Sequence, residues 1–498
     1  MTYLLSQQEK NIFGTFHYLY GLVEHTTTRK SWALLQDGET NVKRGKSKIS
    51  LDEQVKSVYS SASLFHETRH FHDQFGTLGG LSIVTNFFGT LRSFDSANRR
   101  LEAEAGRWQW PALLSSGGLG APIEVRQAIR QMRAFKTGTA LLKGSFKPLE
   151  VEGHLTAMML EAQTSEGHTF DVAADRQIHF NDGEKVEKTV LFPLGLETLF
   201  ESNAHAISRT LAEHYFPKDV ADRLSMQIFY KNLEDDETAN LAEYTLPYMI
   251  LDRLITKYIA NRGQSKFYRN TVIGIADEVL SQIYFRIQHI SPQESQIYVS
   301  RAGELIMEAL HRTSTEDLFA GQIRPSDVVQ EGYTRLAENL AKSHDWDSIE
   351  DDGSFRSAID IWEAYCMKHF TLPLVELRLA TDHRAFRTFE GNFELFKAIP
   401  PPLLAQEGGR KVDLPEPVHR AWAKVVFGGQ IMLELLQGGD LLCPRAYGTV
   451  PGLNRDRFCS KNTCDDYIKL GCGRWDGVRV ENTPCIFTDA LKRVQILG

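Results

Sequence analysis

The part of the sequence with the clearest chemical potential is a short run of histidines and a glutamate. His66, Glu67 and His70 form the pattern HExxH. On an α-helix, residues four positions apart lie on one face, so two imidazoles at this spacing can bind one zinc ion. Zinc lowers the pKa of a bound water molecule to about 7, and a neighbouring glutamate can accept its proton as the water attacks a carbonyl carbon. The pattern therefore predicts metal-assisted hydrolysis, with Glu67 as the general base.

The residues before this pattern predict the helix that it requires. Apolar periodicity indicates a helix over about 51–75, with Ser50 as its N-cap. One apolar stripe of this helix contains Val55, Val58, Tyr59 and Ala62. When the stripe is continued at helical spacing, His66, His70 and Asp73 lie on the same inward face. A hydrogen-bonded pair of buried structural histidines is the alternative interpretation.

The HExxH helix resembles the metal-binding helix of the zincin metallopeptidases. The resemblance implies zinc as the cofactor, hydrolysis of a peptide bond, and a third protein ligand whose identity separates the subgroups of the clan. The metzincin pattern would need Gly at position 73 and His at position 76, where this chain has Asp73 and Gly76. The gluzincin pattern instead takes a glutamate from a later helix.

Glu201 is the best candidate for that third ligand. It lies in a predicted helix over about 195–215, among small residues that would let this helix approach the first one closely. This segment resembles the second metal-binding helix of gluzincin-like proteins. Glu102 and Glu104 are closer to the motif along the chain and are alternative ligands, as is Asp73. Each of these carboxylates could also be an ordinary solvent-facing helix residue.

Three further polar residues accompany the candidate ligands. Asp73 could accept the second ring N–H of a ligand histidine, end the helix, or pair with Arg69. His205 lies one turn beyond Glu201 and could orient it, polarise a substrate carbonyl, or serve as a structural histidine. His72 points to another side of the helix, and we expect that it does not bind the metal.

A second kind of metal site is compatible with some of the same residues. Ferritin-like di-iron bundles use two ExxH pairs and two single glutamates. The candidates for such a set are Glu67, His70, Glu308, His311, Glu24 and Glu201. This oxidoreductase alternative leaves His66 without a role, so the zincin interpretation is favoured. A non-catalytic interaction protein stabilised by a metal is the third alternative.

Five of the six cysteines lie between Cys443 and Cys485. Four thiolates could hold a second, structural zinc ion, which would help this region to fold. The preferred set is Cys459, Cys464, Cys472 and Cys485. No CxxC pair is present, so burial of the cysteines as small apolar side chains is the alternative.

Composition and charge exclude several classes of protein. The 498 residues are 42% hydrophobic and 24% charged, which is typical of a globular protein and not of a disordered chain or a fibre. The net charge of −8 offers no excess of positive charge to a nucleic acid. Without a long apolar run or a secretory signal, we expect a cytoplasmic protein with no membrane partner. The expected partners are a protein or peptide substrate and a regulatory protein.

The sequence as a whole predicts an α+β, mostly helical protein in three parts. Residues 1–215 would form a zincin-like domain with the metal site, a helix at 7–25 and antiparallel β hairpins at 138–192. Residues 216–399 would form a helical domain. Residues 400–498 would form one helix and a Cys-rich module. The expected function is that of an intracellular zinc metallopeptidase.

Overall fold

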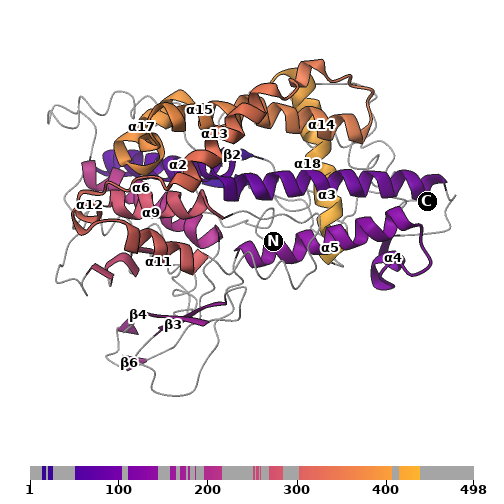
Figure 1. Ribbon diagram of the computed structural model, residues 1–498. Helices are drawn as coiled ribbons and strands as arrows, with labels where there is room; N and C mark the ends of the chain where they lie inside the picture. Colours follow the sequence, from indigo (N-terminus) through magenta and orange to yellow (C-terminus); the bar gives the residue numbers. More distant parts are fainter. Residues whose placement is uncertain are drawn as a thin grey trace.

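The computed structural model describes residues 14–17, 21–25, 51–103, 110–143, 196–215, 269–283, 302–405 and 414–437, and short segments within 158–186 and 251–259. Helices make up most of these residues, as predicted (Figure 1). In the part of the chain just defined, no helix is long and apolar enough to cross a membrane. The division into three domains stays a prediction.

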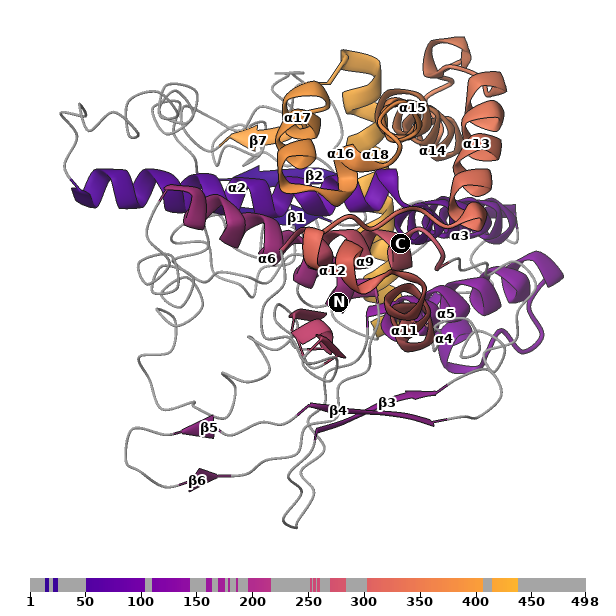
Figure 2. The same ribbon diagram turned by 60° about the vertical axis from the view of Figure 1, so that its left-hand side comes forward.

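The fold is organised around two helices that pack along each other. They are α2 (Leu51–Gly76), which contains the HExxH pattern, and α6 (Leu196–Tyr215), which contains Glu201. Both helices have nearly the bounds predicted from their apolar periodicity. Figure 2 shows α6 lying against α2 with their axes side by side. This pairing brings two segments together that are far apart along the chain.

A sharp corner at Thr77 separates α2 from α3 (Leu78–Ala103). The Thr77 hydroxyl donates a hydrogen bond of 2.5 Å to the carbonyl of Asp73 and accepts one of 3.1 Å from the N–H of Gly80. A Cβ atom on Gly80 would overlap the backbone of Asp73, so this close approach requires glycine. The corner thereby fixes the end of α2 just beyond the histidines.

The remaining helices pack partly on this pair and partly on α3 (Figures 1 and 2). The helices on the N-terminal side of residue 321 are α4 (Trp110–Ser115), α5 (Ile123–Lys143), α9 (Asn270–Leu280), α11 (Ala302–Arg312) and α12 (Thr315–Ala320). The later helices are α13 (Asp327–Lys342), α14 (Phe355–Tyr365), α15 (Leu372–Ala380), α16 (Arg384–Arg387), α17 (Phe389–Ala398) and α18 (Glu416–Gln437). A 3-10 turn (Trp346–Ser348) precedes α14, and a π-helix (Cys366–Thr371) joins it to α15.

The helix predicted over 7–25 is wrong for the residues that the structure describes there. Strands β1 (Gly14–His17) and β2 (Leu22–His25) form an antiparallel hairpin instead, and β7 (Leu403–Ala405) pairs with β2 in parallel. Phe16 and Val23 face each other across the hairpin and are both buried. A period of two, rather than the helical period, therefore governs these residues.

Two further strand pairs lie in the region where hairpins were predicted. Strand β3 (Met158–Gln163) pairs antiparallel with β4 (Thr169–Ala174), and β5 (Ile178–His179) pairs antiparallel with β6 (Lys185–Val186). The side chains of these strands lie outside the described residues. That the strands form a β region of a zincin-like domain stays a prediction.

An aromatic cluster anchors α2 in the core. Phe71 and Phe75, one turn apart on α2, both contact the ring of Phe370 in the π-helix, with centroids 5.1 and 5.2 Å away. Trp362 of α14 contacts the same ring from another side. Large aromatic side chains contribute much of the hydrophobic stabilisation of a core. The face of α2 that carries these rings is thus fixed, and the histidines emerge on a neighbouring face.

Candidate metal centre

Three side chains converge where α2 and α6 meet. His66 and His70 come from α2, and Glu201 comes from α6. One ligand atom from each side chain lies within 4.8 Å of the others. The Nε2 atoms of the two histidines are 3.1 Å apart, and Oε2 of Glu201 lies 3.1 Å from His66 and 3.3 Å from His70. The structure therefore brings together the three residues that the sequence analysis proposed as ligands.

The donor set and its spacing match a zinc site. Tetrahedral zinc with ligand distances of about 2.0–2.1 Å holds neighbouring ligand atoms about 3.3 Å apart. The Nε2 atoms of His66 and His70 are 3.1 Å apart, and they lie 3.1 and 3.3 Å from Oε2 of Glu201, close to that value. Two imidazoles and one carboxylate also form the set of a catalytic zinc ion, which keeps a fourth position for water. The three side chains thus fit the predicted cofactor.

The charges of these three side chains influence one another. Burial alone would raise the pKa of Glu201, but the charges and hydrogen bonds of His70 and His66 outweigh it and hold that pKa well below its usual value. Burial alone would lower the pKa of His70, but the carboxylate of Glu201 outweighs it and the net pKa is raised. Glu201 is therefore ionised and places a negative charge between two imidazole nitrogens.

Glu67 lies beside this group and is partly exposed. Its carboxylate accepts a hydrogen bond from the backbone N–H of Phe16 in β1, and the Phe16 ring stacks with His70 at 6.2 Å. Burial raises the pKa of Glu67, Glu201 adds to this, and the two histidines partly oppose it. A carboxylate next to the ligand group is placed where a general base would be needed. The hairpin that replaced the predicted helix thus holds the candidate base.

His205 and His72 are both buried and neutral. His205 lies one turn beyond Glu201 on α6, and burial, aided by His66 and two arginines, lowers its pKa to about 3. His72 donates a hydrogen bond of 2.8 Å from Nε2 to the carbonyl of Ile399, and burial lowers its pKa to about 3 as well. Neither belongs to the ligand group.

Asp73 is not in the ligand group either, and it pairs with Arg69. Its Oδ1 lies 2.8 Å from both Nε and Nη2 of Arg69, and its two oxygens accept hydrogen bonds of 3.2 and 3.1 Å from Nδ2 of Asn203. Among the roles considered from the sequence, the structure thus shows the pairing with Arg69. It adds a link to α6 that the sequence analysis missed.

The remaining residues proposed for the di-iron site, for the alternative third ligand and for the structural zinc site do not join this group in the described part of the chain. Glu308 and His311 lie on α11, and the ligand group found among the described residues does not contain them. The ring of His311 instead contacts Tyr258. The side chains of Glu24 and Glu102, together with Glu104, Cys459, Cys464, Cys472 and Cys485, lie outside the described residues. Cys366 is a buried free thiol of the π-helix.

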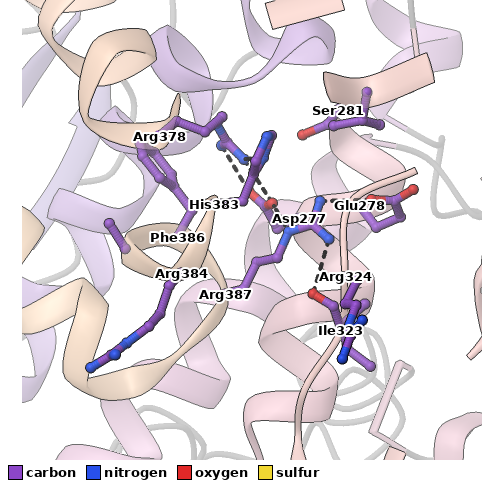
Figure 3. Close-up of polar contacts among 12 residues, drawn as sticks. Asp277, Glu278, Ser281, Ile323, Arg324, Arg378, His383, Arg384, Phe386 and Arg387 are labelled. Carbon is purple, nitrogen blue, oxygen red and sulfur yellow. Dashed lines mark hydrogen bonds and ion pairs between the residues drawn. The ribbon is translucent and has the colours of Figure 1, made fainter. Parts of the chain in front are cut away.

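A buried network of charges behind the site was not foreseen. Asp277 and Glu278 of α9 are completely buried and meet two arginines of the C-terminal helices (Figure 3). Arg378 donates two hydrogen bonds of 2.8 Å to Asp277. Arg387 donates one of 2.9 Å to Asp277 and one of 2.6 Å to Glu278. Arg312 adds a bond of 2.7 Å to Glu278.

The sequence does contain a signal for this network. Every residue of α9 is buried, and its only charged residues are Asp277 and Glu278. Buried carboxylates need cationic partners, because an unpaired buried charge costs several kcal/mol. Burial alone would raise the pKa of Asp277, but the guanidinium groups of Arg378 and Arg387 hold it well below its usual value. Two acidic residues in an apolar helix thus indicate arginines elsewhere, without saying which.

Comparison of the chain with models of protein families, with curated proteins and with solved structures gives no match. The interpretation of the site therefore rests on the identity of the side chains and their geometry.

Proposed function

We propose that this protein is a zinc-dependent metallopeptidase. The observation that carries the proposal is the convergence of His66, His70 and Glu201 at separations suited to one zinc ion, with Glu67 beside them. Three protein ligands and one free position are typical of catalytic rather than structural zinc. The zincin resemblance of the HExxH helix supports a peptide bond as the target. A cytoplasmic location and a regulatory protein partner remain parts of this proposal.

The proposed chemistry assigns a separate task to each side chain. His66, His70 and Glu201 would hold zinc, which supplies an acidified water molecule and polarises the substrate carbonyl. Glu67 would take up a proton from the attacking water and pass it to the departing amine. The backbone N–H of Phe16 would hold the carboxylate of Glu67 in place for both roles. The neutral His205 leaves the charge of the ligand group unchanged.

The geometry favours this function over the two alternatives. A di-iron oxidoreductase needs Glu308 and His311 near His70, and the ligand group does not include them. It also leaves His66 unused, although His66 lies 3.1 Å from Glu201. A purely structural metal site does not need a partly exposed glutamate held next to the ligands. Glu67 is therefore the residue that separates a peptidase from a metal-stabilised interaction protein.

Substitution of Glu67 by Gln tests the catalytic role. We expect the wild-type protein to bind zinc and to cut members of a random peptide library in a chelator-sensitive manner. Glu67→Gln should retain zinc but lose activity by about 10²–10⁴-fold, the usual contribution of a general base. Zinc is measured by elemental analysis and cleavage by mass spectrometry. Glu331→Gln, an exposed carboxylate on α13, is the matched control and should behave as wild type.

The outcome of this experiment discriminates among the three functions. Equal activity in the Glu67→Gln variant would contradict the proposed mechanism. Zinc binding without any cleavage of peptides or proteins would favour an interaction protein. Two irons per chain in place of zinc would favour the di-iron oxidoreductase.

A structural zinc ion in the Cys-rich region is a separate part of the proposal. Cys459, Cys464, Cys472 and Cys485 would hold it, in addition to the ion at the candidate centre. The wild-type chain should then contain two zinc ions. A variant with His66 and His70 both replaced by Ala should contain one. A single zinc in the wild type that disappears in this variant would contradict the second site.

A further inference from the structure

A polar contact joins the two ligand-bearing helices next to the ligands themselves. Asp73 lies three residues after His70 on α2, and Asn203 lies two residues after Glu201 on α6. The Asn203 amide donates to Oδ1 and Oδ2 of Asp73 at 3.2 and 3.1 Å. Both residues are completely buried. A directional contact between the two helices therefore exists within one turn of the candidate metal site.

Asp73 is itself held in place from the opposite side. Its Oδ1 lies 2.8 Å from both Nε and Nη2 of Arg69. Arg69 is held in turn by hydrogen bonds to the carbonyl of Phe386, at 2.9 Å, and to the side chain of Asn392. It also lies 3.7 Å from the carboxylate of Asp277, within the buried network of Figure 3. The acceptor for Asn203 is thus a fixed point and not a mobile side chain.

We propose that Asp73 and Asn203 are positioning residues, which set Glu201 against His66 and His70 and thereby determine the affinity for zinc. Apolar packing between α2 and α6 is non-directional and permits small sliding movements. Zinc ligand distances, by contrast, vary by only about 0.2 Å. The hydrogen bonds from Asn203 to the buried carboxylate of Asp73 are directional, so they fix how far α6 can slide along α2. This inference rests on the proposed metal site.

An exchange of the two side chains tests the inference. Asn203→Asp places a second carboxylate against Asp73, and we expect the affinity for zinc to fall by about 10–100-fold, as is usual for groups that support metal ligands. The double variant Asp73→Asn with Asn203→Asp restores one amide, one carboxylate and the original total charge. It should recover most of the lost affinity. Recovery by exchange is expected only if the two residues act through each other.

The affinity is measured on the full chain by competition with a chromophoric zinc chelator, and folding is followed by circular dichroism. Asn98→Asp is the matched control. Asn98 is a buried helical asparagine of α3, whose Oδ1 accepts a hydrogen bond of 2.6 Å from the Trp110 indole. The same chemical change there should leave the affinity for zinc unchanged, even if it lowers the melting temperature.

Each outcome either supports or overturns the inference. The inference is supported if Asn203→Asp loses affinity for zinc and the double variant recovers it. It is overturned if Asn203→Asp binds zinc as tightly as the wild type, or if the double variant recovers no affinity. It is also overturned if Asn98→Asp loses as much affinity for zinc as Asn203→Asp. A wild-type protein that binds no zinc overturns both this inference and the proposed function. A protein that binds zinc but cleaves nothing overturns the proposed function alone, because the affinities still report on positioning.

Discussion

The candidate metal ligands could be predicted from the sequence to different extents, and Glu201 was the most difficult of them. The two histidines and Glu67 could be placed on one helix by spacing alone, because a helix fixes the relation between positions four apart. Glu201 lies 135 positions from His66, and no local periodicity spans that distance. Its selection over Glu102 and Glu104 came from the small residues around it and from the zincin resemblance. The sequence could not exclude the other two, since all three lie in segments whose pattern predicts a helix.

Substitution of the third ligand separates the zinc centre from the di-iron alternative. We expect Glu201→Gln to weaken zinc binding, because a neutral amide replaces the only anionic ligand of the group. Glu308→Gln on α11 should have no effect. Metal content and zinc affinity of the two variants are measured in parallel. Metal loss in Glu308→Gln would contradict the single-ion centre and support a site that includes α11.

At the scale of elements, the sequence predicted helices much better than strands. The bounds of α2 and α6 follow from long amphipathic repeats, which agree with the packing of these helices on each other. Strands β1 and β2 are only four residues long each, too short for a period of two to stand out. The turn between them depends on Gly21, with a φ of +61°, beside the ring of Phe75. That contact is tertiary, and local sequence does not reveal it.

The close packing of α14 and α18 leads to a prediction about two glycines. The ring of Phe355 in α14 covers Gly428 of α18, and an added Cβ would overlap that ring. We expect Gly428→Ala to lower the free energy of unfolding by about 1–3 kcal/mol, the usual cost of overpacking. Gly89→Ala in α3 meets only the end of Gln131, at 3.5 Å, and should stabilise the protein by up to about 1 kcal/mol through helix propensity. The free energies of unfolding of both variants are measured by denaturant unfolding. Equal changes in the two variants would contradict the packing argument.

At the scale of the molecule, buried charges connect the metal-binding helix to the C-terminal helices. Arg378 donates a hydrogen bond of 2.9 Å to the carbonyl of Gly76, at the end of α2, while it pairs with Asp277 of α9. Tyr333 of α13 donates another, of 3.0 Å, to the same carbonyl. These partners are between 101 and 302 positions apart along the chain. The sequence showed that α9 needs cations, but only the packing of distant helices selects which arginines supply them.

The same network makes the stability of the whole molecule sensitive to acid. His383 is completely buried; Nδ1 faces Nη1 of Arg378 at 3.2 Å, and Nε2 donates to Gln330 at 2.8 Å. Burial, aided by the charges of Arg378 and Arg387, lowers its pKa to about 3. The unfolded chain therefore binds the proton first as the pH falls. The contribution of His383 to the free energy of unfolding is fully present above about pH 6.5 and falls as the pH drops towards 3, by up to about 1.4 kcal/mol per pH unit.

We expect the free energy of unfolding of His383→Gln to depend less steeply on pH between pH 6.5 and 4.5, as measured by urea unfolding at several pH values. Comparison of slopes rather than absolute stabilities removes the effect of the altered packing, and identical slopes would show that His383 is protonated in the folded protein.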